Sequence, residues 1–285
     1  MTSRKLRGVR KKVPQLIDLS IPLENAALSE PSFGPEFGSP PRIEYFPHSY
    51  TPKFFFEPLF GCSADELPNG LGQAIEVVHA IVHSATHCDA PWHYSPVTER
   101  GKERSMTIDE VPLDWFYGPG VILDFTHKQP GEPITKEDVV TALDKIGYKI
   151  KKHDIVLFRT DAYKLWGKQA YLTHFPGVVK SAAEYLINKG VRVMGIDAYN
   201  FDMPFVTEKR LYKETHDASH IEPCHMSLGF EHNYAHIEKL ANLDKVPRPY
   251  GFTFSALPVK IKGASAGWSR AVAIVETEEE ERGGN

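Results

Sequence analysis

The sequence predicts an α/β domain, because short apolar segments typical of buried strands alternate along the chain with amphipathic segments typical of helices. The composition agrees, since 41% of the 285 residues are hydrophobic and 25% are charged, as in most globular proteins. No apolar run reaches the length of a membrane span, and a net charge of −4 does not indicate a nucleic-acid or acidic-membrane partner. We therefore expect a small-molecule partner, and neither nucleic acid nor membrane.

The chain is expected to form one domain, residues 14–277, between two charged tails. Residues 1–13 are basic and lack the apolar segment of a secretory signal, so they predict a disordered tail. Residues 278–285 are acidic and predict a second tail. The three cysteines have no short pair spacing and do not indicate a disulfide framework, which favours a reducing, cytoplasmic location.

Within the domain, periodicity and breaker residues place the elements in order. Strands are expected at 14–21, 74–82, 120–125, 154–158 and 191–197, a short helix and turn at 106–117, and helices at 135–146 and 177–188. Thr135, with Asp138 three residues later, predicts the cap of one helix, and Gly190 the end of another.

Residues 22–72 have no regular period and are rich in proline, glycine and aromatic residues. A segment of this length without periodicity is typically a functional loop or an arm that contacts another subunit. Phe54, Phe55 and Phe56 are therefore interpreted in two ways, as the wall of a pocket for an aromatic substrate or as part of a buried subunit contact. The sequence favours neither interpretation.

Residues 83–93 concentrate three histidines and one aspartate. His83, His87, Asp89 and His93 all occupy odd positions, so an extended segment would place their side chains on one face. Imidazole nitrogens together with a carboxylate oxygen suit a borderline divalent cation such as zinc or manganese. A lone histidine is more often structural, but four donors at this spacing predict a metal site.

This segment resembles the His-x-Gly-Thr-His-x-Asp-x-Pro-x-His signature of the metal-dependent cyclase family, which includes bacterial kynurenine formamidase and isatin hydrolase. Ala85 stands where the signature usually has glycine. Residues 154–160, 175–177 and 195–197 resemble further landmarks of the family, and residues 254–260 and 263–275 resemble its closing strands. The resemblance extends over roughly residues 14 to 275, and it implies a swivelling β/β/α fold and a homodimer or homotetramer.

A second segment, residues 225–243, resembles the other half of the family's site. His225 opens a His-x-x-Leu sequence, and Glu238 precedes an Asn-Leu pair. In the kynurenine formamidase branch the matching His and Glu help to hold a second zinc, and the aspartate of the first signature is shared. The resemblance therefore implies that His225, Glu238 and Asp89 are ligands, with one or two metals per chain. From spacing alone, Glu238 would be interpreted as a surface helix residue.

The expected activity is hydrolysis of an amide C–N bond by metal-activated water, with His93 as the general acid/base that the resemblance implies. The expected substrate is a cyclic or related aromatic amide. An arylformamidase that acts on N-formylkynurenine is the alternative that Glu238 favours. A non-catalytic metal-binding or ligand-binding protein on the same fold is the second alternative.

Several residues have weaker interpretations. Trp92 and Arg270 are further candidates for substrate binding, and the planar guanidinium of Arg270 suits either a substrate carboxylate or a structural ion pair. Cys88 and Cys224 lie beside candidate ligands, so a cysteine hydrolase is a third hypothesis. We favour the interpretation of both cysteines as small buried residues.

Overall fold

The computed structural model describes residues 11–25, 28–30 and 40–279. Most of the two predicted tails, residues 1–10 and 280–285, lies outside the described residues. Strand β1 (Lys11–Asp18) pairs antiparallel with β15 (Val272–Glu279), beginning with Lys11 opposite Glu279. Strand pairing therefore extends a short way into both segments that we expected to be tails.

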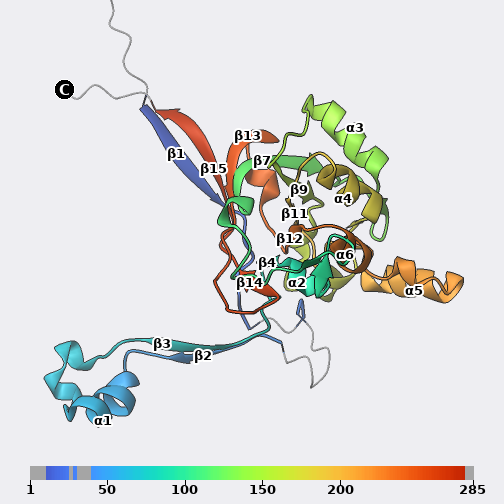
Figure 1. Cartoon of the computed structure of the whole chain (residues 1–285). Helices are drawn as coiled ribbons and strands as arrows, with labels where there is room; N and C mark the ends of the chain where they lie inside the picture. Colours follow the sequence, from blue (N-terminus) through green and yellow to red (C-terminus); the bar gives the residue numbers. More distant parts are fainter. Residues whose placement is uncertain (1–10, 26–27, 31–39, 280–285) are drawn as a thin grey trace, which may run out of the picture.

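A mixed sheet of nine strands runs through the described part of the chain (Figure 1). Its order is β1, β15, β13 (Tyr250–Ser255), β7 (Tyr117–Asp124), β9 (Ile155–Arg159), β11 (Val193–Ile196), β12 (Ala235–Glu238), β4 (His87–Asp89) and β14 (Ala266–Trp268). The central strands β7, β9, β11 and β12 run parallel, and the others pair antiparallel. The predicted α/β class is confirmed.

Both faces of the central strands are buried, which explains their continuous apolar sequences. Val156 and Phe158 pack into one hydrophobic cluster, and Leu157 between them packs into another. Helices α3 (Lys136–Ile146) and α4 (Lys180–Ile187) cover the first of these faces (Figure 1). In the described residues no helix is both long and apolar enough to cross a membrane.

The remaining short elements join these layers. They are α2 (Pro91–Tyr94), α5 (Phe205–Thr215), α6 (Gly229–Glu231), the pair β5 (Val97–Thr98) and β6 (Glu103–Arg104), and the pair β8 (Pro133–Ile134) and β10 (Gly177–Val178). The predicted cap of α3 is confirmed, because Thr135 and Asp138 exchange hydrogen bonds. The helix expected from residue 177 begins only at Lys180, since residues 177–178 pair with β8. The short helix and turn expected at 106–117 are present as a turn at 108–110 and a 3₁₀ helix, Leu113–Trp115.

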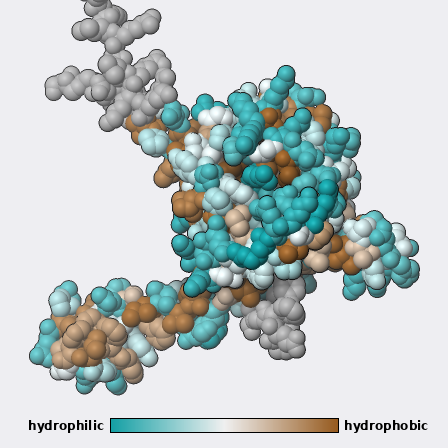
Figure 2. All heavy atoms as spheres, viewed as in Figure 1, coloured by the Kyte–Doolittle hydropathy of each residue, from teal (hydrophilic) through white to brown (hydrophobic). Residues whose placement is uncertain are grey.

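Residues 42–79 form a hairpin arm that projects from the body (Figure 1). Its strands β2 (Arg42–Phe46) and β3 (Ile75–His79) pair only with each other, and its tip carries short helical turns, among them α1 (Glu57–Phe60). The strand expected at 74–82 is therefore present, but it is exposed and lies outside the central sheet. Figure 2 shows that hydrophobic residues gather along the arm and over its tip.

Candidate metal centre

Strands β4 and β12 bring the two predicted signatures together. Their antiparallel register places His236 opposite Asp89 and Glu238 opposite His87. Successive pairs on one face of an antiparallel sheet lie within contact distance, so four ligand-type side chains meet here. The prediction of a shared extended face holds for His87 and Asp89 only.

His83 and His93, the first and last histidines of the signature, also contribute to this cluster, although neither lies on strand β4. His83 lies in the turn that precedes β4, and His93 lies in helix α2, which begins at Pro91 directly after the strand. Ala85, at the signature's glycine position, has a φ of +51°. This left-handed conformation favours glycine, and here the Glu30 carboxylate accepts the Ala85 amide hydrogen at 2.6 Å.

Asp89 is fully buried at the centre of the cluster. Its Oδ1 lies 2.8 Å from Nδ1 of His83, and its Oδ2 lies 2.9 Å from Nε2 of His236. Neither oxygen, however, has a hydrogen-bond partner of acceptable geometry among the described residues. Buried carboxylate oxygens that have no hydrogen-bond partner and lie beside imidazole nitrogens fit the ligands of a cation.

The donor atoms form two groups that share Asp89. We name Asp89, His225, His236 and Glu238 the inner group, and all four are buried. We name His83, Asp89 and His93 the outer group. Within each group the donor atoms lie within 4.8 Å of one another, which fits a bound cation. Nε2 of His87 also borders the site, 3.3 Å from the Asp89 carboxylate and 3.7 Å from that of Glu238.

Hydrogen bonds around the cluster orient its imidazoles. Nδ1 of His87 donates to the Ala85 carbonyl at 2.8 Å, so the Nε2 lone pair faces the site. Nδ1 of His225 lies 2.7 Å from the Asp202 carboxylate, which turns its Nε2 toward the inner group. Such carboxylate–histidine pairs fix the tautomer of a ligand and raise its basicity.

The electrostatics of the inner group also fit a cation. Burial, together with the charge of Asp89, raises the pKa of Glu238 to about 7. Burial lowers the pKa of His225, but the hydrogen bond and charge of Asp202 outweigh this effect and raise the pKa to about 10. Two buried carboxylates side by side are unfavourable without a compensating positive charge, which a divalent ion or a protonated His225 can supply.

His93 has one edge against the cluster and one exposed edge. Its ring centroid lies 4.0 Å from that of His83 and 5.4 Å from that of His225. Burial of the inner edge and the neighbouring imidazoles lower the pKa of His93, although Asp89 opposes this. The ring is therefore neutral at pH 7, and this position suits either a third ligand of the outer group or a proton acceptor.

A cavity of about 500 Å³ opens onto this cluster. It is lined by Ile81, His83, His93, Tyr199, Asn200, Phe205, Glu222, His225, Glu238 and Lys239. Apolar and aromatic side chains thus face the ligands across a space of the size that small-molecule sites have.

The structure does not bring the predicted substrate-binding residues to this cavity. Phe54, Phe55 and Phe56 lie in the hairpin arm, so within one chain they cannot line it. Trp92 is 40% exposed and lies outside the lining. The guanidinium of Arg270 makes a bidentate ion pair with Asp18, at 2.7 and 3.0 Å. This contact supports a structural ion pair for Arg270 over the binding of a substrate carboxylate.

Both cysteines beside the site are buried thiols. Sγ of Cys88 donates to the Ala256 carbonyl, and Sγ of Cys224 donates to the Val178 carbonyl. Burial raises the pKa of both thiols, so neither is activated as a thiolate nucleophile. The geometry supports small buried side chains over a cysteine hydrolase.

The sequence interpretation missed His236 and Asp202. His236 precedes Glu238 by two residues, a spacing that shares one face of a strand, but we had not predicted a strand at 235–238. No local pattern could indicate Asp202, because its contact with His225 joins residues 23 positions apart.

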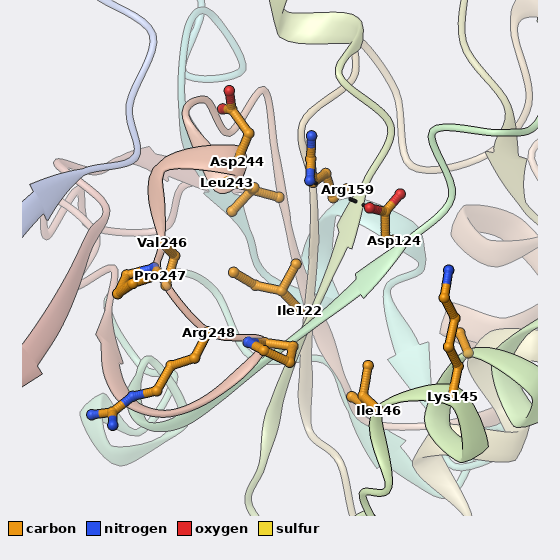
Figure 3. A pocket seen from close by; sticks show the side chains of 12 residues that line it. Ile122, Asp124, Lys145, Ile146, Arg159, Leu243, Asp244, Val246, Pro247 and Arg248 are labelled. Carbon is orange, nitrogen blue, oxygen red and sulfur yellow. Dashed lines mark hydrogen bonds and ion pairs between the residues drawn. The ribbon is translucent and has the colours of Figure 1, made fainter.

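Figure 3 shows a second, smaller pocket of about 270 Å³ between α3, β7, β9 and residues 243–249. Arg159 and Asp124 form an ion pair in its wall at 3.3 Å. Its lining contains none of the inner or outer group. The ligand cluster and the cavity that opens onto it therefore remain the candidate active site.

Comparison with known proteins agrees with this geometry. The chain is 27% identical over 210 residues to isatin hydrolase of Roseibium aggregatum, covering 68% of this chain and 72% of that protein. It is 24% identical over 213 residues to cyclase-like protein 2 of Oryza sativa subsp. japonica, covering 73% of this chain and 68% of that protein.

Solved structures share the fold. Isatin hydrolase A from Ralstonia solanacearum superposes with a TM-score of 0.71 at 24% identity, covering 92% of each chain. Isatin hydrolase A from Labrenzia aggregata, bound to benzyl benzoate, gives 0.68 at 24% identity and covers 92% of this chain and 94% of that one. The cyclase family model matches residues 17–203, more than half of the sequence. The chain belongs to the cyclase family.

Proposed function

We propose that this protein is a metal-dependent hydrolase that cleaves the C–N bond of a cyclic or related aromatic amide. One observation supports it above all: the buried Asp89 is shared by two groups of imidazole and carboxylate donors at one end of the cavity. The relatives named isatin hydrolase support the same class of activity.

The inner and outer groups would hold one or two divalent cations, zinc or manganese, because both metals accept mixed nitrogen and oxygen ligands. Asp89 would be a ligand with either number of ions, because it belongs to both groups. When bound, the cation would polarise a carbonyl and lower the pKa of water toward about 7.

The chain's own residues then position the substrate and move the proton. Tyr199 and Phe205 offer an aromatic wall for a planar ring. His93, neutral and exposed to the cavity, accepts a proton from the attacking water and delivers it to the leaving nitrogen. That transfer is required, because an amide nitrogen is a poor leaving group until it is protonated, and a general acid/base typically contributes about 100- to 10,000-fold.

An arylformamidase that acts on N-formylkynurenine is the second candidate. Glu238 favours it, because this buried carboxylate completes the inner group and so supports two metals rather than one. Both substrates carry an aromatic ring, so the shape of the cavity does not separate them.

The test compares isatin with N-formylkynurenine on protein whose metal content has been measured by mass spectrometry. We expect hydrolysis of at least one substrate, sensitivity to chelators, and a loss of at least about 100-fold in kcat for His93→Ala with metal content retained. His48→Ala, an exposed histidine of the hairpin arm, is the matched control. Loss of metal in His93→Ala would make His93 a ligand. No hydrolysis of either substrate by the metal-loaded protein would favour a binding protein.

We also propose that the chain assembles as a homodimer or homotetramer through its hairpin arm. A two-stranded hairpin has no core of its own and is marginally stable in isolation. The arm nevertheless exposes Phe54, Phe55, Leu59 and Phe60 at its tip. An apolar surface of this kind is typical of a subunit contact.

A further inference from the structure

A buried ion pair lies beside the metal centre but belongs to neither donor group. Oε1 of Glu30 lies 3.0 Å from Nζ of Lys239, and both side chains are only 6% exposed. Removing two charges from water offsets most of the attraction between them, so a buried ion pair adds little net stability by itself. Its significance therefore lies in the groups that it contacts.

The ion pair contacts the backbone of the signature turn, residues 83–87. Oε1 of Glu30 accepts the Ala85 amide hydrogen at 2.6 Å, and Nζ of Lys239 donates to the His83 carbonyl at 2.7 Å. The Ala85 carbonyl in turn accepts the hydrogen on Nδ1 of His87 at 2.8 Å. These contacts hold the peptide groups that lie between the first two histidines of the signature.

Ala85 depends on such contacts more than the usual glycine would. Its φ of +51° is left-handed, a conformation that glycine adopts freely and that a residue with a Cβ adopts only where its surroundings hold it. A change in this turn would displace His83 and His87 together, because each lies two residues from Ala85. The hydrogen bond from the Ala85 amide to Glu30 is therefore placed to keep both imidazoles in position.

Glu30 also compensates the charge of Lys239. Lys239 follows Glu238 in the sequence, and both residues line the cavity that opens onto the donor groups. Among the described residues, Glu30 is the carboxylate that pairs with this ammonium group. An uncompensated ammonium group in this buried position would repel a cation at the donor groups, since charges interact strongly where water is excluded.

We propose that Glu30 is a positioning residue for the metal centre. Its carboxylate holds the left-handed turn at Ala85 and neutralises Lys239, so that His83 and His87 face a bound cation without a competing positive charge. Glu30 itself belongs to neither donor group. The inference rests on the metal site of the proposed function, and it is independent of which amide bond is hydrolysed.

The test measures cobalt(II) binding, because cobalt accepts the same mixed nitrogen and oxygen ligands as zinc and its visible absorption spectrum reports the coordination geometry. Affinity is determined by competition with a chelator, and the spectrum is recorded at saturation. Glu30→Gln keeps the size of the side chain and an oxygen acceptor for the Ala85 amide, but it removes the charge. Asp154→Asn is the matched control, because Asp154 is a buried carboxylate outside the cavity that accepts hydrogen bonds from Tyr148 and the Lys151 backbone.

We expect Glu30→Gln to lower cobalt affinity by about 10- to 100-fold, as loss of a supporting group around a metal site does, and to change the visible spectrum. Addition of Lys239→Met removes the uncompensated ammonium group, so the double variant should bind cobalt more tightly than Glu30→Gln. A purely stabilising role for Glu30 predicts the reverse, because a second loss would add to the first. Asp154→Asn should leave cobalt affinity and the spectrum unchanged.

If Glu30→Gln does not fold, Glu30→Asp provides the measurement. The shorter variant keeps the charge but cannot reach both the Ala85 amide and Lys239, so it should also lower cobalt affinity and change the spectrum. Unchanged cobalt binding in the Glu30 variants, an equal effect of Asp154→Asn, or a double variant that binds more weakly than Glu30→Gln would overturn the role of Glu30.

The proposed function can fail separately. If the wild type binds no cobalt, the metal site and the role of Glu30 fail together. If the wild type binds cobalt and Glu30→Gln has no effect, only the role of Glu30 fails. If neither isatin nor N-formylkynurenine is hydrolysed but the Glu30 variants still alter cobalt binding, the hydrolase proposal fails and the role of Glu30 stands.

Discussion

The body and the hairpin arm distribute their side chains in opposite ways. In the body, polar residues are buried: Asp89, His87 and His236 are completely inaccessible. In the arm, apolar residues are exposed: Phe54 is 55% and Phe60 is 65% accessible. Each inverts the usual preference, in which charged residues remain in water and large apolar residues are buried.

The two inversions have different physical causes. Burying charged groups is unfavourable unless they are compensated, so the body retains them where a bound cation can provide the compensation. Exposing aromatic groups is unfavourable unless another surface covers them, so the arm indicates a protein contact. In both regions the departure from the usual pattern points to something that binds there.

The largest effect should follow from Asp89→Asn. Asp89 belongs to both donor groups, so its loss weakens every metal position at once. We expect metal affinity to fall by well over the roughly 10- to 100-fold typical of losing a supporting group, with activity lost in parallel. Metal analysis after dialysis measures this. Asp65→Asn, an exposed carboxylate of the arm, is the control, and equal effects of the two changes would contradict the separation of the regions.

Shortening the arm tests whether its exposed aromatic residues mediate assembly of the chain. Replacement of residues 47–74 by Asn-Gly joins Phe46 to Ile75, which already face each other across the hairpin. We expect monomers in light scattering, with metal content retained, because the ligands all lie in the body. An oligomer of unchanged size, or a wild-type protein that is already monomeric, would show that the arm does not mediate assembly.

Asp202→Asn tests how much the carboxylate that orients His225 contributes to metal binding. The change keeps the size of the side chain but removes the charge that holds Nδ1 of His225. Metal affinity should fall by roughly 10- to 100-fold, less than for Asp89→Asn. Competition with a chelator of known affinity provides the measurement. A loss as large as that of Asp89→Asn would mean that Asp202 itself binds metal.

The smallest effect concerns two glutamates with opposite pKa shifts. In the body, burial and the charge of Asp202 raise the pKa of Glu208 from 4.5 to about 8, whereas in the arm hydrogen bonds from Ser63 lower the pKa of Glu66. Folded Glu208 keeps a proton that the unfolded chain releases, so its contribution to stability falls as pH rises from 4.5 through 8.

Glu208→Gln should remove this dependence. Above pH 8 the variant should be more stable than the wild type by at least about 1 kcal/mol, or at least about 2–4 °C in Tm, and the difference should vanish below pH 4.5. Thermal unfolding across this pH range measures the effect. Glu66→Gln should show no such gain, and an identical pH profile for the two variants would contradict the role of burial.

Local patterns predicted elements well where the sequence itself contains the signal. The capping box at Thr135 and Asp138 lies within four residues, and the apolar strand at 155–159 is buried on both faces as expected. At 106–117 the helical part is limited to Leu113–Trp115, because Pro112 disfavours a helical conformation in the residue before it. The 74–82 strand formed, but its partner in the arm could not be inferred from periodicity, which does not identify the neighbouring strand.

His83, His87, Asp89 and His93 could be predicted as site residues from the sequence alone, because they lie within one stretch whose residue types indicate metal chemistry. The resemblance to the cyclase family added His225 and Glu238. Only the tertiary structure decided that His236 joins them and that Asp202 orients His225. Those contacts depend on the register of β4 and β12 and on the loop that carries Asp202. Contacts between residues far apart in sequence leave no periodic signal along the chain.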